Sequence, residues 1–202
     1  YFPASIGTRM FPRLVDHLAN GVTGNKWEVL SNVARTMNFR LTVRDNKIGG
    51  GNNESVNTAV TFDATKGPFL ITSQNTSGIG YTEGSTQTVT WSGTNTNTMA
   101  GAANVNIKLS TDGGLTYPIT LLANTANDGS ESITFPLGVF APKCRILVEP
   151  TGNNFYAINT KDFAIGYTIT TQCTDYTINL ATPRVIPEGS YTGISFSVPD
   201  SY

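Results

Sequence analysis

Few residues of this chain are of the kinds that carry out chemistry, and they lie far apart in the sequence. His17 is the single histidine among 202 residues. A Ser-His-Asp triad, a Cys-His pair and a histidine-bound zinc each need a histidine as base or ligand. In PRLVDHLAN, Leu14, Val15 and Leu18 fall at helical spacing, so we expect His17 on a short helix with its side chain in solvent. We therefore predict no catalytic residue and expect that the chain is not an enzyme.

Oxygen ligands for a cation are the remaining candidate chemistry. Asp112, Asn127 and Asp128 fall at expected turns, where they could bring calcium ligands to one end of a β-sandwich. The alternative is that each side chain caps its own turn by accepting hydrogen bonds from backbone N–H groups. A glycosidase needs two carboxylates, but the fourteen acidic residues form no pair at a recognisable strand end. Calcium is thus the one candidate cofactor, and the alternative is that the chain binds no cofactor.

The elements that position Asp112 have the clearest pattern in the chain. In NVNIKLS, Val105, Ile107 and Leu109 alternate with polar residues, which is typical of a half-buried strand. The following STDGGLTY has the form S-x-D-x-G-x-T-aromatic of an Asp-box hairpin turn, in which glycine supplies the positive φ. YPITLLAN and ESITFP then continue the pattern. Residues 104–136 therefore predict strand, tight turn, strand, loop and strand.

The predicted fold class is all-β, with an immunoglobulin- or fibronectin-like β-sandwich flanked by partial β-modules. About seven strands are expected in residues 67–167, with turn signals roughly every dozen residues. Gly67-Pro68 is the candidate boundary before this sandwich. We expect Trp91 at the centre of the core. The apolar residues expected to pack around it are Phe69, Ile71, Ile133, Phe135, Ile146 and Val148.

The flanking segments look incomplete. In residues 1–66, Met37, Phe39, Leu41 and Val43 alternate with polar residues to predict one strand, and residues 56–62 predict its partner. These elements are too few to close a sandwich, so we interpret 1–66 as the C-terminal part of a β-sandwich module of PKD or immunoglobulin-like type. Residues 168–202 are expected to be a linker and the opening strands of a further β-module.

The amino-acid composition limits the classes of partner and the cellular location that we expect for this chain. Charged residues make up 13% of the chain and the net charge is −1, so no electrostatic field favours nucleic acid or anionic lipid. No stretch approaches the roughly 20 apolar residues that span a bilayer. The first residues lack the pattern of a signal peptide. A surface rich in Thr, Asn, Ser and Gly is common in extracellular bacterial modules, so we expect a secreted or cell-surface location.

The cysteines and several aromatic residues each allow two interpretations. Cys144 is either a buried strand thiol or one half of a disulfide with Cys173, which would contribute about 3–4 kcal/mol in an oxidising compartment. Four aromatic residues near turns either stack on sugars or hold a peptide, or else pack half-buried. They are Tyr81, Tyr117, Phe155 and Tyr156.

Several stretches together resemble a known family. They are WEVLSNVARTMNFRLTVRDNKIGGG, the pair PFLITSQN and TVTWSGTNTN, and VNIKLSTDGGLTYPITLLANTANDGSESITFP with the later KCRILVEPTGNNFYAIN. They resemble the region downstream of the catalytic domain in secreted reprolysin-like zinc metalloproteases of Bacteroidetes and marine bacteria. IPEGSYTGISFSVPDS is similar to the opening strands of a module like the proprotein-convertase P domain.

The resemblance implies a non-catalytic accessory region of a secreted bacterial zinc metalloprotease, acting as a spacer, a stabilising module or a substrate anchor. The family's catalytic motif is an extended H-E-x-x-H with a third histidine, and nothing in this chain corresponds to it. The implied partners are the remainder of the parent protease and an extracellular protein or polysaccharide. The alternative function is a cell-surface adhesion or carbohydrate-binding module, which an exposed aromatic platform would favour and buried aromatic residues would oppose.

Overall fold

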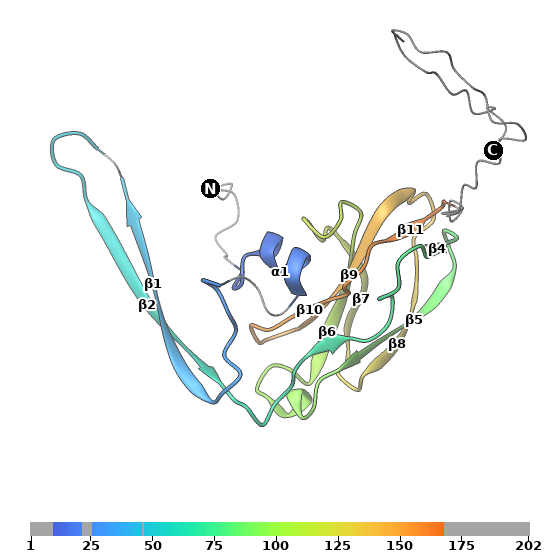
Figure 1. Ribbon diagram of the computed structural model, residues 1–202, viewed down its shortest axis with the longest axis horizontal. Helices are drawn as coiled ribbons and strands as arrows, with labels where there is room; N and C mark the ends of the chain where they lie inside the picture. The colour runs from blue at the N-terminus through green and yellow to red at the C-terminus, as the bar shows by residue number, and fades with distance from the viewer. Residues whose placement is uncertain (1–9, 22–25, 46, 168–202) are drawn as a thin grey trace, which may run out of the picture. The chain divides into compact units, whose positions relative to one another are not determined.

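The computed structural model describes residues 10–21, 26–45 and 47–167 (Figure 1). The predicted third module and Cys173 lie outside the described residues. The elements in chain order are α1 (Leu14–Asn20), β1 (Arg35–Arg44), β2 (Asn53–Phe62), β3 (Leu70–Ile71), β4 (Gly80–Tyr81), β5 (Thr86–Ser92), the 3-10 helix η2 (Thr96–Thr98), β6 (Asn104–Ser110), β7 (Ile119–Ala126), β8 (Ser130–Thr134), β9 (Ala141–Pro150), β10 (Ala157–Ile158) and β11 (Phe163–Ile165).

Strands β3 to β11 form two sheets that share one core, so the predicted all-β, sandwich-like fold is confirmed. The larger sheet has the strand order β4-β11-β9-β6-β7, with β10 paired to β9. The smaller sheet has the order β3-β5-β8. The strand, turn, strand, loop and strand expected in residues 104–136 are β6, β7 and β8, but β8 pairs with β5 and not with β7. The chain therefore changes sheets in the short loop between β7 and β8.

The core between the sheets contains the residues expected from the sequence. Trp91 is 4% exposed, and each of the six apolar residues expected around it belongs to the same buried cluster. Val105, Ile107 and Leu109 on β6 are fully buried, as their alternation predicts. Ser110 is fully buried as well, although the alternation placed it on the polar side of the strand. Its hydroxyl is used inside the turn that follows.

Hydroxyl pairs join neighbouring strands on the outer surfaces of the small sheets. In β3-β5-β8, the side-chain oxygens of Thr72 and Thr90 lie 2.7 Å apart, and those of Thr86 and Thr134 lie 3.0 Å apart. In the β1–β2 hairpin, the Thr42 and Ser55 hydroxyls are 2.9 Å apart. Such cross-strand pairs stabilise a sheet without charge. Part of the abundant threonine of this chain therefore has a structural role in its sheets.

The strands that the sequence did not predict are short. β4 has two residues and pairs in parallel with β11, and residues 157–165 form two short strands, β10 and β11, with a break between them. The division begins at Asn159, whose buried side chain accepts from the Ile146 N–H of β9 and donates to the Lys161 carbonyl within the break. A two-residue strand has too few residues to show an alternation, so pattern alone could not detect it.

The β1–β2 hairpin is the two-stranded sheet predicted from the alternation in residues 37–43. Ten residues of each strand pair in an unbroken antiparallel register, from Arg35 opposite Phe62 to Arg44 opposite Asn53. Several of its apolar side chains remain exposed, with Leu41 at 62%, Val43 at 60% and Val56 at 58%. A two-stranded hairpin of this kind is at best marginally stable in water by itself.

Helix α1 confirms the short helix expected at PRLVDHLAN, but the expectation that His17 faces solvent is wrong. His17 is 8% exposed, and its ring packs edge-on against Tyr156 with centroids 5.6 Å apart. Helical spacing alone could not show which side of α1 faces the sandwich, because the helix has only seven residues. No helix in the described ranges combines the length and apolar character needed to span a membrane.

We predict that Trp91→Ala lowers the free energy of unfolding by about 3–5 kcal/mol, because it opens a cavity in the shared core. Urea denaturation followed by far-ultraviolet circular dichroism measures this change. Trp27→Ala is the matched control: Trp27 is 81% exposed, so its loss should change stability by less than about 0.5 kcal/mol. Equal effects of the two substitutions would contradict the central position of Trp91.

Candidate functional site

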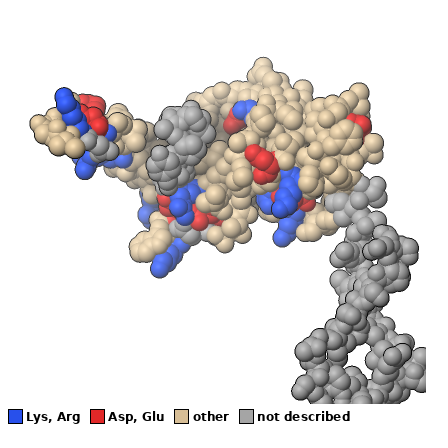
Figure 2. Space-filling model, turned by 90° about the horizontal axis from the view of Figure 1, so that it is seen from above, with Lys and Arg blue, Asp and Glu red and all other residues tan. Residues whose placement is uncertain are grey.

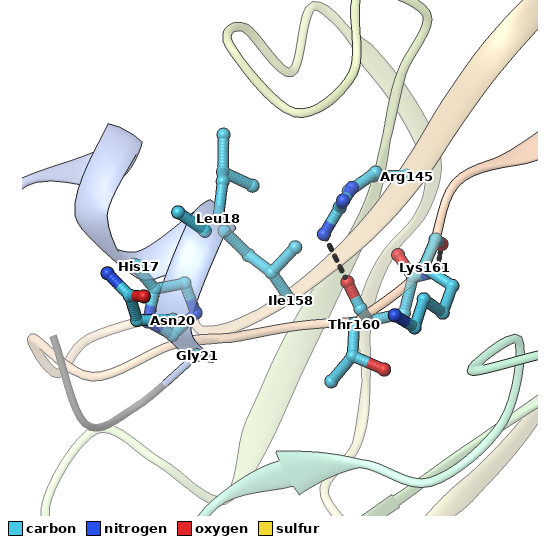
Figure 3. Close-up of a pocket in the computed structure, with 10 residues that line it drawn as sticks. His17, Leu18, Asn20, Gly21, Arg145, Ile158, Thr160 and Lys161 are labelled. Atoms are coloured by element: carbon cyan, nitrogen blue, oxygen red, sulfur yellow. Dashed lines mark hydrogen bonds between the residues drawn. The ribbon is translucent and has the colours of Figure 1, made fainter.

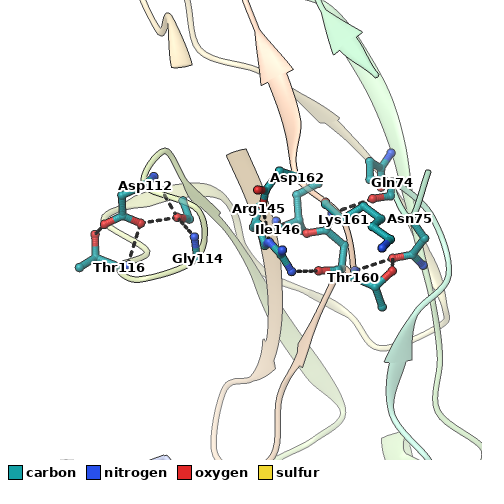
Figure 4. Close-up of polar contacts among 12 residues, drawn as sticks. Gln74, Asn75, Asp112, Gly114, Thr116, Arg145, Ile146, Thr160, Lys161 and Asp162 are labelled. Atoms are coloured by element: carbon teal, nitrogen blue, oxygen red, sulfur yellow. Dashed lines mark hydrogen bonds and ion pairs between the residues drawn. The ribbon is translucent and has the colours of Figure 1, made fainter. Parts of the chain in front are cut away.

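The Asp112 turn closes on itself through hydrogen bonds (Figure 4). The Ser110 hydroxyl donates to Asp112 Oδ1 over 2.6 Å and accepts from the Gly114 N–H over 2.8 Å. The Thr116 N–H donates to Asp112 Oδ1 over 2.9 Å, and the Thr116 hydroxyl donates to Oδ2 over 2.7 Å. Gly114 has a φ of +95°, which a residue with a side chain rarely adopts. Both carboxylate oxygens are thus used inside the turn.

The environment of Asp112 keeps its carboxyl group ionised. Partial burial raises its pKa, but hydrogen bonds from Ser110 and Thr116 outweigh that effect and leave the pKa below its ordinary value. A carboxyl group whose pKa is lowered in the folded state contributes stability above its unfolded pKa, near 3.9, and loses it as the pH falls through the folded pKa. The turn should therefore weaken only in acid below about pH 4.

We predict that Asp112→Asn lowers the free energy of unfolding by about 1 kcal/mol at neutral pH, because its amide NH₂ replaces one of the two carboxylate oxygens that accept hydrogen bonds from Thr116. The difference from the natural sequence should shrink as the pH falls below about 4, where Asp112 itself becomes protonated. Chemical denaturation over a pH series measures both effects. The difference should be equal in EDTA and in millimolar calcium, and a difference that grows with calcium would instead make Asp112 a metal ligand.

Asn127 and Asp128 lie at the opposite end of the β6–β7 hairpin from Asp112. β6 ends just before Asp112, whereas Asn127 follows β7 at the end where Asn104 pairs with Ala126. The three residues expected at one calcium site are therefore not brought together. In the part of the chain that the structure describes, no three His, Cys, Asp or Glu residues lie close enough to hold a metal ion.

The Asn127 side chain is buried and forms hydrogen bonds within the core. Its Oδ1 accepts a 2.8 Å hydrogen bond from Trp91 Nε1, and its Nδ2 donates to the Ala102 carbonyl over 2.9 Å. Asp128 is exposed, and its Oδ1 accepts from the Ser130 N–H over 3.3 Å. A polar cavity of ≈ 320 Å³ adjoins this loop, with Asn95 and Asn97 on its other side. Asp128 therefore matches the turn-capping alternative, whereas Asn127 bonds to the Trp91 side chain and the Ala102 carbonyl and not to its own turn.

A second polar network, which the sequence analysis missed, is centred on Asn159 (Figure 4). Asn159 is fully buried, and its Oδ1 accepts from the Ile146 N–H over 2.7 Å. Its Nδ2 donates to the carbonyls of Gln74 and Lys161 over 2.7 and 2.6 Å. This one amide therefore joins its own segment to β9 and to Gln74, which is 85 residues away. An asparagine inside an otherwise strand-like stretch was the signal available for it.

Arg145 extends this network toward the surface. Its Nε donates to Asp162 Oδ1 over 2.5 Å, and its Nη1 donates to the Asn159 carbonyl over 3.0 Å. The Arg145 side chain is 12% exposed, so its charge is balanced by Asp162 in a partly buried setting. Arg145 thus holds the β10–β11 segment against β9.

We predict that Asn159→Ala lowers the free energy of unfolding by about 2–4 kcal/mol, because it leaves buried backbone groups without partners. Thr160→Ala is the neighbouring control: Thr160 is exposed, and among the described residues its hydroxyl bonds to Asn75 Oδ1, at 3.0 Å. Its effect should stay below about 1 kcal/mol. Equilibrium denaturation of both variants measures the difference, and equal losses would contradict a structural role specific to Asn159.

A cavity of ≈ 270 Å³ lies between the second half of α1 and the larger sheet (Figure 3). Its lining includes His17, Arg145, Ile158, Thr160 and Lys161. Burial, and after it the charge of Arg145, lower the pKa of His17, so its imidazole is neutral at pH 7. Among the described residues that line this cavity there is no carboxylate, and the groups that accompany His17 are amides, the Thr160 hydroxyl and the cationic side chains of Arg145 and Lys161. The cavity therefore offers polar and cationic contacts without a recognisable catalytic arrangement.

The four candidate aromatic residues are packed, half-buried, and do not form a platform. Tyr81 lies against Phe135 and Phe163 of the core, with ring centroids 5.3 and 5.4 Å apart. Phe155 packs edge-on against Phe69 at 4.9 Å. The hydroxyls of Tyr117 and Tyr156 are buried. These contacts correspond to the packing alternative for all four.

Cys144 is a buried strand thiol in β9. It is fully buried, and burial raises the pKa of its thiol to about 11. A thiol with so high a pKa is neutral and unreactive at physiological pH. The disulfide alternative involves Cys173, which lies outside the described residues.

Comparisons with known proteins do not place the chain in a family. No protein-family model matches it, and no curated protein matches it in sequence.

Proposed function

We propose that this chain is a non-catalytic accessory region of a secreted bacterial zinc metalloprotease, in which it acts as a spacer, a stabilising module or a substrate anchor. The observation that carries the proposal is the exposed apolar face of the β1–β2 hairpin. Leu41, Val43 and Val56 share this face, and each is more than half exposed. An exposed cluster of this kind on a marginal two-stranded sheet supports a role next to further polypeptide.

The two faces of the hairpin differ in polarity, as a contact between one face and further polypeptide requires. Residues at odd positions of β1 and at even positions of β2 share one face, which carries the apolar side chains. The other face carries hydroxyl pairs, such as Thr36 with Thr61 at 3.2 Å, together with Arg40 and Arg44. One polar and one apolar face is the pattern of a sheet that is solvated on one side and packed on the other. We assign the packed side to the remainder of the parent protease.

The surface of the sandwich supports a spacer or stabilising role. Figure 2 shows a face on which charged residues form small separate groups of both signs among uncharged residues. Surfaces of this kind do not steer charged ligands. The alternative function, a cell-surface adhesion or carbohydrate-binding module, has less support because the candidate aromatic residues are packed into the sandwich.

The test uses the protein as its source organism secretes it, detected with antibodies against residues 67–167. We expect a species much larger than 202 residues, with proteolytic activity that a zinc chelator abolishes and zinc restores. A secreted species of only this size, or a larger one without zinc-dependent proteolysis, would overturn the proposal. In that case, binding to a polysaccharide array would test the alternative.

Substitutions in the hairpin test the assigned partner within the same secreted protein. Leu41→Asp places a charge on the apolar face, whereas Thr42→Asp places it on the polar face one residue away. We expect Leu41→Asp to reduce the yield of active protease several-fold, because an unpaired charge at a packed interface is costly. Thr42→Asp should leave the yield within about twofold. Equal yields from the two variants would contradict the assignment of the apolar face.

A further inference from the structure

Three buried polar atoms without partners gather where α1 meets the sandwich. They are His17 Nδ1, Tyr117 Oη and Tyr156 Oη, none of which has a hydrogen-bond partner among the described residues. The rings of His17 and Tyr156 are in edge contact, with centroids 5.6 Å apart. Buried polar groups of folded proteins are nearly always paired, so three at one interface call for an explanation.

The tight turn at Gly114 brings Tyr117 into this interface. A Cβ atom placed on Gly114 would lie 2.7 Å from Leu18 Cδ2 of α1 and 3.0 Å from Tyr117 Oη. The same position is 3.3 Å from Arg145 Cδ on β9. The α1 helix, the turn after β6 and strand β9 therefore meet at one point, and the unpaired atoms belong to a single contact.

This contact holds α1 only weakly. Each unpaired polar group loses its water on docking and gains no hydrogen bond in return, which opposes the burial of the His17 and Leu18 side chains. The helix has seven residues and no side-chain hydrogen bond at its N-cap, so it would not persist once detached. Docking and helix formation are consequently one equilibrium, and a small change in either state can shift it.

The charged groups around His17 make this equilibrium sensitive to acid. Arg145 on β9 and Lys161 on the same cavity wall are cationic, and the nearby Asp162 carboxylate already accepts from Arg145 Nε. On α1 itself, Asp16 Oδ2 accepts from Arg13 Nε over 2.7 Å. Tyr117 and Tyr156 stay neutral, since burial raises the pKa of each. A proton added to His17 would therefore create a buried cation beside Arg145, and His17 Nδ1 has no hydrogen-bond partner among the described residues.

We propose that α1 is an acid-released latch, in which neutral His17 keeps the helix docked on the sandwich and protonation of His17 detaches it. The direction follows from linkage. The pKa of docked His17 is lowered below the ordinary value near 6.5, so docking is strongest above that pH. As the pH falls below about 6.5, docking weakens up to tenfold per pH unit until the pKa of the docked state is passed. This latch stands independently of the proposed role in a protease.

Amide hydrogen exchange of the whole 202-residue chain tests the latch. We expect protection of the α1 amides, corrected for intrinsic exchange rates, to fall about tenfold or more between pH 7.5 and pH 5, while protection of β6 and β9 stays constant. His17→Phe keeps an aromatic edge against Tyr156 but cannot be protonated. Its α1 protection should be the same at both pH values. A pH-independent natural chain, or a His17→Phe variant that retains the pH dependence, would overturn the proposal.

Two further measurements keep the test decisive if His17→Phe fails to dock. Since His17 is the single histidine of the chain, its ring protons can be followed by NMR without ambiguity. We expect it to titrate below pH 6.5 and together with the loss of α1 protection, whereas titration at or above 6.5 would refute the latch. Tyr156→Phe removes one unpaired hydroxyl that does not titrate in this range. It should raise α1 protection by a similar factor at both pH values.

Discussion

The hydrogen bond from Trp91 Nε1 to Asn127 Oδ1 is the interaction on which the arrangement of the two sheets depends. A buried indole needs an acceptor for its N–H, and here the loop that crosses between the sheets supplies it. The Trp91 backbone N–H donates to the Gly129 carbonyl over 2.9 Å, and the Asn127 N–H donates to the Ala103 carbonyl over 2.8 Å. The crossing is therefore fixed to β5 on one side and to the start of β6 on the other. This explains why Asn127 is not free to bind a cation.

Much of this fold could be predicted from the sequence because its core strands are long and regular. Alternation in β6 identified which of its positions are buried, alternation in β1 identified a strand, and the Ser110 to Thr116 turn was recognisable from its residue types. The sheet to which β8 belongs could not be predicted. That choice depends on the Trp91–Asn127 contact, which joins residues 36 positions apart. Strands β4, β10 and β11 were too short to show a period.

The candidate sites were less predictable than the fold, since each depends on contacts between distant segments. Asp112 and Asp128 both lie in turns, as expected, but the hairpin places them at opposite ends. Asn159 gains its importance from Gln74, which is 85 residues away, and no local pattern indicates such a bond. His17 was expected in solvent because it lies between a charged residue, Asp16, and an apolar one, Leu18. Its ring packs against Tyr156, which the helix meets only in the folded chain.

The hydroxyl pairs that join the outer strands have a consequence for the conditions in which the molecule can work. Attraction between exposed charges is screened within about 8 Å at physiological ionic strength and more strongly in brine. A hydrogen bond between two threonine hydroxyls involves no net charge, so dissolved salt hardly weakens it. With Thr72 bonded to Thr90 and Thr86 to Thr134, the small sheet keeps its cross-strand contacts as the surrounding medium becomes more saline.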